Sequence, residues 1–232
     1  WIARRNAAWA LGALDDNRAV AALVESMRDR EAPVREQSAW ALGAIDDTQA
    51  VPALIAALKD QDFRVRRQAA WALGAIDDSR AVPGLIQAIE DVDERTRAQA
   101  AWALGAIDDR SAVPALSRAL ADKTPAVRKQ AAWALGLSDD AASRPALLEA
   151  LADPSDRVRD QAVWALGVRR DREARGFGDD AGIGAHTAID QAFRARALPL
   201  FVDDGCHHDF SREPGLRGAP RGAAHRCHAA FH

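Results

Sequence analysis

Apolar residues recur along this chain at helical spacing, in a pattern of apolar and polar positions that repeats every 31 residues. In residues 48–78, the first half places its apolar residues at i, i+3, i+4 and i+7: Val51, Leu54, Ile55 and Leu58. The second half has a similar stripe: Val65, Ala69, Ala72, Leu73 and Ile76. We therefore predict one helix over about 48–59 and another over about 64–75. No sustained period-two alternation supports strands.

The repeat is marked by a Trp-Ala-Leu-Gly tetrapeptide that recurs at a fixed interval. Its tryptophans are Trp9, Trp40, Trp71, Trp102, Trp133 and Trp164. This spacing gives a half repeat and then five helix pairs, ending near Gly167. One pair cannot bury its own apolar face, whereas stacked pairs can. We predict an all-α fold over residues 1–168, an α-solenoid of antiparallel helix pairs.

Each unit also carries a proline in its first helix, an aspartate eight residues later and an arginine six residues beyond. These residues are Pro52, Asp60, Arg66; Pro83, Asp91, Arg97; Pro114, Asp122, Arg128; and Pro145, Asp153, Arg159. The first full repeat keeps Asp29 and Arg35 but has Ala21 in place of the proline. The unit resembles the short HEAT repeat, in particular the kind named for phycobilisome lyase subunits. This resemblance implies a fold, but it implies little about function because the repeat serves many tasks.

The recurring aspartates and arginines predict a ladder of charge-assisted hydrogen bonds between neighbouring repeats. Its predicted members are Asp29, Arg35, Asp60, Arg66, Asp91, Arg97, Asp122, Arg128, Asp153 and Arg159. We expect this ladder to set the register of the repeats more than to supply their stability, because exposed ion pairs contribute only about 0–1 kcal/mol each.

The tryptophans have two possible roles. Trp71 lies roughly 140° around the helix from the apolar stripe, with Gln68 between them, so it is not a simple core position. The Gln-x-x-Trp pattern recurs with Gln37, Gln68, Gln99, Gln130 and Gln161, and Asn6 precedes Trp9. Because second helices line the concave side of HEAT arrays, these residues are candidates for a partner-binding ribbon. Alternatively, each indole packs on the next repeat, and one side chain could do both.

Paired aspartates follow most of the second helices and form a second recurring feature. The pairs are Asp15/Asp16, Asp46/Asp47, Asp77/Asp78, Asp108/Asp109 and Asp139/Asp140. Helix capping explains them better than cation binding, because no single repeat gathers enough oxygen ligands on a shaped loop. We predict no metal site and no cofactor in the array.

Composition narrows the functional classes. Residues 1–168 contain more acidic than basic residues and neither histidine nor cysteine, and the net charge of the chain is −3. The cluster Arg64, Arg66, Arg67 looks local to one repeat, so no sustained basic face predicts nucleic-acid binding. No catalytic motif and no run of eighteen apolar residues occurs, so we expect neither an enzyme nor a membrane span. A cytoplasmic location is favoured.

Residues 169–232 lose the repeat and are predicted to be an irregular or disordered tail. This segment holds every histidine and both cysteines, including Cys206, His207, His208, His225, Cys227 and His228. Their spacing matches no known zinc module, so metal binding is a minor alternative. An out-of-frame reading of a GC-rich gene also explains its abundance of Arg, Gly, Ala and His.

The chain begins at Trp1 without a methionine and without the first helix of its first repeat, so we expect a fragment. These features favour a protein-protein interaction scaffold or regulatory module that binds another protein or peptide along its concave face. The resemblance leaves a second hypothesis open: a phycobilin lyase-type subunit, or an accessory module of a larger bacterial enzyme.

Overall fold

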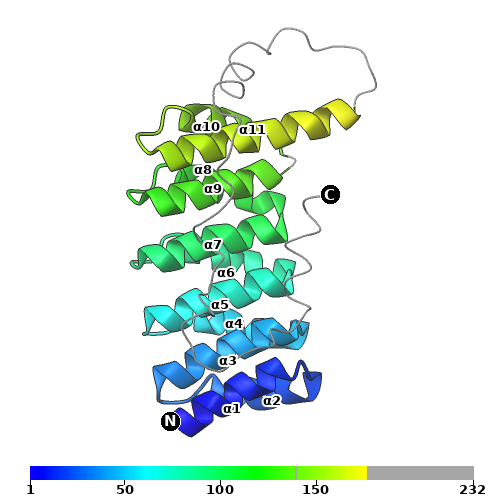
Figure 1. Ribbon diagram of the computed structural model, residues 1–232, viewed down its shortest axis with the longest axis vertical. Coiled ribbons are helices and arrows are strands. Elements are labelled where there is room, and N and C mark those ends of the chain that lie inside the picture. Colours follow the sequence, from blue (N-terminus) through cyan, green and yellow to red (C-terminus); the bar gives the residue numbers. More distant parts are fainter. Residues whose placement is uncertain (139, 177–232) are drawn as a thin grey trace. The chain divides into compact units, whose positions relative to one another are not determined.

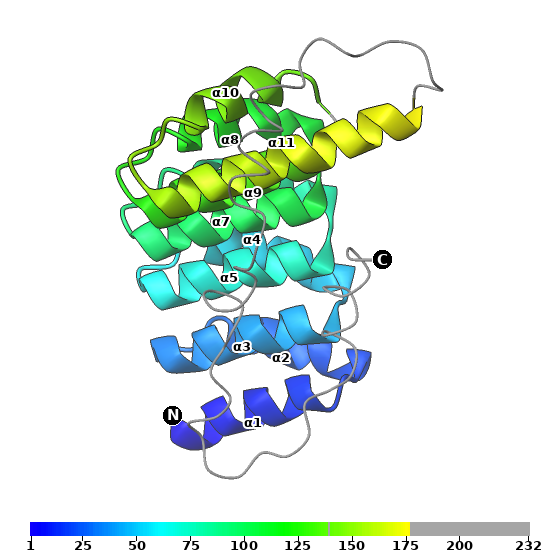
Figure 2. The same ribbon diagram turned by 45° about the horizontal axis from the view of Figure 1, so that its top comes forward.

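The computed structural model describes residues 1–138 and 140–176, and every regular element in these residues is helical. The prediction of an all-α solenoid is confirmed. The helices form two layers that run the length of the array, with one helix of each repeat in each layer (Figure 1). Figure 2 shows the second helices stacked one above another in the order of the sequence.

The layer of second helices consists of long α-helices. They are α1 (Ile2–Ala13), α3 (Ala32–Ile45), α5 (Phe63–Ile76), α7 (Glu94–Ile107), α9 (Pro125–Leu137) and α11 (Asp156–Gly176). The layer of first helices consists of shorter elements. They are α2 (Val20–Ser26), α4 (Val51–Ala57), α6 (Val82–Ala88), α8 (Val113–Ala119) and α10 (Ser143–Ala150). Short 3-10 turns lead into four of them: η1 (Asn17–Ala19), η2 (Thr48–Ala50), η3 (Ser79–Ala81) and η4 (Arg110–Ala112).

The paired aspartates mark the boundary between one repeat and the next. Asp46 ends α3 in the left-handed region at φ 57°, a conformation that aspartate tolerates better than most residues. Asp47 then accepts a hydrogen bond from the backbone N–H of Gln49 and caps η2. Pro52 lies in the first turn of α4, where a missing N–H costs little. The same arrangement recurs at Asp15/Asp16, Asp77/Asp78 and Asp108/Asp109, so each of these four pairs reverses the chain between two helices.

A single apolar core runs between the layers. Its largest fully buried side chains come from both layers and include Leu42, Leu54, Leu73, Leu85, Leu104 and Leu135. Alanines fill the narrow space between neighbouring second helices, and many of these alanines are completely buried. Leucine thus joins the two layers, whereas alanine allows the second helices to lie close together.

The second helices approach one another at the glycine of each Trp-Ala-Leu-Gly sequence. A Cβ placed on Gly74 would lie 2.8 Å from both Cα and Cβ of Ala103 in the next repeat. The same approach recurs at Gly12, Gly43, Gly105 and Gly136. Neighbouring second helices pack along their length, whereas neighbouring first helices contact each other little. The layer of second helices is therefore the more closely packed one. We call its outer surface the concave face, after the expectation for HEAT arrays.

The end of the array differs from the sequence prediction. Helix α11 continues to Gly176, so the expectation of irregular structure from residue 169 is wrong for residues 169–176. The sequence from 168 to 175 contains helix-favouring Arg, Glu and Ala and no glycine or proline, so nothing in it stops the helix. The predicted disorder, the metal-binding alternative and the out-of-frame reading for residues 177–232 lie outside the described residues.

Candidate functional site

The concave face is formed by five positions of each second helix. In α5 they are Arg64, Arg67, Gln68, Trp71 and Ala75. These positions lie at i, i+3, i+4, i+7 and i+11, which is one side of a helix. Because the repeats are stacked in register, equivalent positions form rows that cross the helices. The predicted ribbon of glutamines and tryptophans occupies the two central rows.

The tryptophans are neither core residues nor free surface residues. Each of the six in the ribbon is half-buried. One edge of the indole faces the preceding repeat: a Cβ on Gly43 would lie 2.8 Å from Cζ3 of Trp71, and one on Gly74 would lie 2.8 Å from Cζ3 of Trp102. The same contact occurs for Trp40, Trp133 and Trp164, whereas Trp9 has no preceding glycine in the chain. Packing between repeats fixes each ring and leaves part of it accessible.

The glutamines lie beside these rings, one helical turn away. Gln37, Gln99, Gln130 and Gln161 are half-buried, and Gln68 is only 5% exposed. An amide that is held at the edge of an aromatic ring offers both a donor and an acceptor to a bound chain. The described part of the concave face thus combines apolar ring surface with half-buried amide groups on α3, α7, α9 and α11, whereas the amide of Gln68 on α5 is buried.

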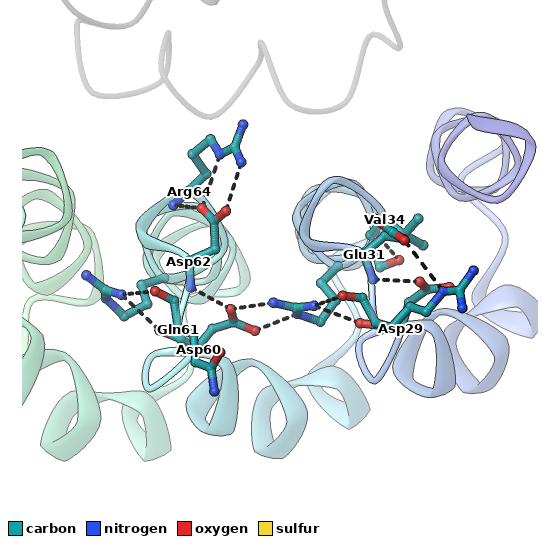
Figure 3. Close-up of polar contacts among 11 residues, drawn as sticks. Asp29, Glu31, Val34, Asp60, Gln61, Asp62 and Arg64 are labelled. Atoms are coloured by element: carbon teal, nitrogen blue, oxygen red, sulfur yellow. Dashed lines mark hydrogen bonds and ion pairs between the residues drawn. The ribbon is translucent and has the colours of Figure 1, made fainter. Parts of the chain in front are cut away.

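The aspartates and arginines of the ladder lie at a different place. The aspartates are on the loops that join the first and second helices (Figure 3), and the arginines are in the first turn of the second helices. Each ladder arginine from Arg35 to Arg128 donates two hydrogen bonds to the aspartate of the following repeat. In the pair Arg35–Asp60, Nε and Nη2 both lie 2.7 Å from the carboxylate oxygens. The same bidentate contact joins Arg66 to Asp91, Arg97 to Asp122 and Arg128 to Asp153.

Each rung of this ladder also holds the loop of its own repeat. The Nη1 of Arg66 donates to the backbone carbonyl of Asp60 at 2.9 Å, and the carboxylate of Asp60 accepts from the backbone N–H of Asp62 at 2.9 Å. The charged groups are largely shielded, since the side chains of Arg66 and Asp91 are 12% and 10% exposed. The ladder fixes the loops and the spacing of repeats. The charges of its paired members neutralise one another.

The ladder lowers the pKa values of four aspartates: Asp29, Asp60, Asp122 and Asp153. Burial of Asp122 opposes ionisation, but hydrogen bonds from Arg97 and from the backbone N–H of Thr124 outweigh it and lower the pKa of the carboxyl group. The balance at Asp60 is the same, with Arg35 and Asp62 as donors. At Asp29 the hydrogen bond from Arg4 dominates and lowers the pKa to about 2.

The structure adds one member that the sequence-based set omitted. Arg4 in α1 pairs with Asp29, with Nε 2.6 Å from the carboxylate. Arg4 precedes Arg35 by the 31-residue period, so the repeat itself could have identified it. At the other end, Arg159 donates to the carbonyl of Asp153 at 2.7 Å and also contacts Asp156. Within residues 1–138 and 140–176, no cluster of three His, Cys, Asp or Glu is arranged to hold a metal ion.

Comparisons with known proteins agree with this architecture. HEAT repeats match residues 27–95 and 82–167, and a HEAT-like repeat matches residues 1–45. None of the curated proteins matches the chain. Among solved structures, the complex of CpcE and CpcF of phycocyanin lyase from Nostoc sp. PCC7120 is 30% identical, with a TM-score of 0.55. The similarity covers 72% of this chain and 71% of that chain.

Two further structures are similar in fold. An engineered protein is 25% identical, with a TM-score of 0.54, and the match covers 72% of this chain and 52% of that chain. A designed armadillo repeat protein in complex with the peptide (KR)4 is 19% identical, with a TM-score of 0.56 over 71% of this chain and 91% of that chain. This last likeness concerns the fold alone.

These comparisons do not support the expectation that the chain is not an enzyme, because one similar structure belongs to a lyase. No described helix is long and apolar enough to cross a membrane. The repeats that match span most of the described residues, and the close glycine contact recurs at Gly12, Gly43, Gly74, Gly105 and Gly136. The chain belongs to the HEAT repeat family and forms a helical repeat scaffold.

Proposed function

We propose that this array binds a peptide or domain of another protein along the concave face of α5, α7 and α9. The observation that carries the proposal is the row of Trp71, Trp102 and Trp133, in which each ring is held by the preceding repeat at one edge and remains partly accessible. Rings that are fixed before binding lose little conformational entropy when a partner covers them. Partly exposed aromatic side chains with polar neighbours are typical of binding surfaces.

The rows of the concave face suit an elongated partner. A segment crossing the second helices would meet one tryptophan per repeat and the half-buried glutamines Gln99 and Gln130. Their amides can form hydrogen bonds with the backbone or side chains of the segment. The ladder residues do not take part, because their charges are already paired at the loops. We therefore separate a binding ribbon, which consists of the tryptophans and glutamines, from a structural ladder.

The test selects, from a library of random dodecapeptides, those that bind the array. The affinity of the selected peptides is then measured for the array and for variants in which glutamines are replaced. We expect Gln99→Ala together with Gln130→Ala to weaken the selected peptides about tenfold, equivalent to about 1.4 kcal/mol. Alanine favours helix, so the fold should persist. Fluorescence anisotropy with a labelled peptide measures the dissociation constant.

The matched control replaces Gln49 and Gln87, which are exposed on the layer of first helices, by alanine. This double variant should bind as the unmodified array does. The proposal fails if no peptide is enriched, or if the two double variants bind equally well.

A second candidate function is that of a phycobilin lyase-type subunit. The observation that favours it is the 30% identity to the phycocyanin lyase complex, whose two named proteins are CpcE and CpcF. The described residues contain neither cysteine nor histidine, so a pigment would have to be held by other groups. Incubation with a bilin distinguishes this candidate, because binding would change the visible absorption of the pigment.

A further inference from the structure

The concave face carries an excess of positive charge, although the whole chain has a net charge of −3. The two rows beside the glutamines contain the basic residues Arg5, Arg64, Arg67, Arg95, Lys129 and Arg157. The same rows contain only two acidic residues, Glu36 and Asp160. In the sequence, Arg64, Arg66 and Arg67 form one local cluster. The structure instead directs Arg66 into the ladder and leaves Arg64 and Arg67 on the concave face.

These charges are only partly compensated within the described residues. Arg64 pairs with Asp62 at 2.8 Å, and Arg67 lies 3.8 Å from Glu36 on the neighbouring helix. Arg95 and Lys129 make no ion pair with any residue that the structure describes. Arg95 is exposed and Lys129 is half-exposed, so both can meet a partner.

The uncompensated charges lie next to the binding ribbon. On α7, Arg95 is one turn from Gln99, which is itself one turn from Trp102. On α9, Lys129 precedes Gln130 and is four residues from Trp133. The contact between Arg67 and Glu36 shows that side chains in this row reach from one second helix to the next. A segment that covers Trp102 and Trp133 therefore passes directly beside both cations.

We propose that the partner segment is acidic, with carboxylates that pair with Arg95 and Lys129 while apolar side chains cover Trp102 and Trp133. The inference rests on the proposed function, since it names the chemistry of the segment that the ribbon would bind. Arginine can hold a carboxylate by two parallel hydrogen bonds, and lysine can hold one as a point charge. Complementary charge would also increase the rate of association.

A protein segment fits this surface better than a nucleic acid. Acidic residues flank the basic rows at both ends of the helices, with Asp62 and Asp93 at the N-termini and Asp78 and Asp109 beyond the C-termini. Glu36 also interrupts the row itself. A phosphate backbone needs a sustained positive path and would be repelled at these positions. A short peptide with spaced carboxylates can avoid them.

The experiment uses the full chain, the selected random dodecapeptides and a double variant, Arg95→Glu with Lys129→Glu. The matched control, Lys59→Glu with Arg118→Glu, makes the same charge change at an exposed position in the turn after α4 and at an exposed position of α8. We expect the enriched peptides to be acidic and their affinity to fall at least tenfold in the concave-face variant, but not in the control. The affinity should also fall as salt is added. Circular dichroism melts verify that both variants fold.

The outcomes separate this inference from the proposed function. If enriched peptides are neutral or basic, yet still depend on Gln99 and Gln130, the ribbon binds partners and the acidic assignment is wrong. If no peptide is enriched, the proposed function itself fails. The affinity for a single-stranded oligonucleotide is measured in parallel. If the oligonucleotide binds more tightly than the best peptide, and if this binding is lost in the concave-face variant, the inference is overturned in favour of nucleic acid.

Discussion

Replacing Gly74 by alanine should destabilise the array by about 2 kcal/mol. The new Cβ would lie 2.8 Å from the Cα of Ala103, a backbone atom that cannot move aside without separating α5 from α7. Overpacking of this kind costs up to about 3 kcal/mol, and the better helix propensity of alanine returns about 1 kcal/mol. Urea denaturation followed by circular dichroism gives the free energy of unfolding. Because repeats are coupled only to their neighbours, a weakened central interface should also broaden the transition.

The control is the same substitution at a glycine that does not face a neighbouring backbone. Gly84 lies inside α6, and a Cβ there would be 3.1 Å from Cδ1 of Leu58, the end of a flexible side chain. Gly84→Ala should be neutral or should stabilise the array by up to about 1 kcal/mol. If both variants are equally stable, close approach at the Trp-Ala-Leu-Gly sequence does not set the spacing of the second helices.

The second large effect is expected at the ladder. Arg97→Met should cost about 2–3 kcal/mol, because it leaves the shielded carboxylate of Asp122 and the carbonyl of Asp91 without their donor. Asp122→Asn keeps an acceptor for the backbone N–H of Thr124 but removes the charge. A double-mutant cycle with these two substitutions should give a coupling energy of about 1–2 kcal/mol.

The pair Arg28–Glu25 provides the exposed control, with side chains that are 77% and 72% exposed. Its coupling energy should be below about 0.5 kcal/mol.

Measuring the coupling energy of Arg97 and Asp122 in acid provides a second control. The lowered pKa of Asp122 means that its contribution is complete above the unfolded-state pKa of about 4 and is lost as the pH falls through the lower folded value. A coupling energy that is equal in the two pairs, or unchanged in acid, would contradict the assigned role of the ladder.

The sequence predicted the fold because its strongest signal is a period, and a period of helix pairs has few possible structures. The 31-residue spacing and the positions of residues such as Pro52 were sufficient for the HEAT assignment. The angle of Trp71 from the apolar stripe also indicated a position outside the core, which agrees with its half-buried indole. Aspartates of these pairs cap the 3-10 turns, as their residue type and their position between helices suggested.

Other features depend on how neighbouring repeats meet, which no single repeat reveals. The close contact between Gly43 and Trp71 could not be inferred from helical periodicity, because it involves two helices separated by a third in the sequence. Arg66 and Arg67 are adjacent in sequence but lie on different surfaces, one at the ladder and one on the concave face. The excess of positive charge on that face becomes visible only when the repeats are stacked in register.

The most direct test of the proposed binding ribbon is acrylamide quenching of tryptophan fluorescence, with and without a selected peptide that lacks tryptophan. In the free array the half-buried rings should be partly accessible to the quencher. A peptide that covers the concave face should lower the quenching constant substantially. Saturating binding that leaves quenching unchanged would show that the partner lies elsewhere, and it would contradict the assignment of the tryptophan and glutamine rows as the binding surface.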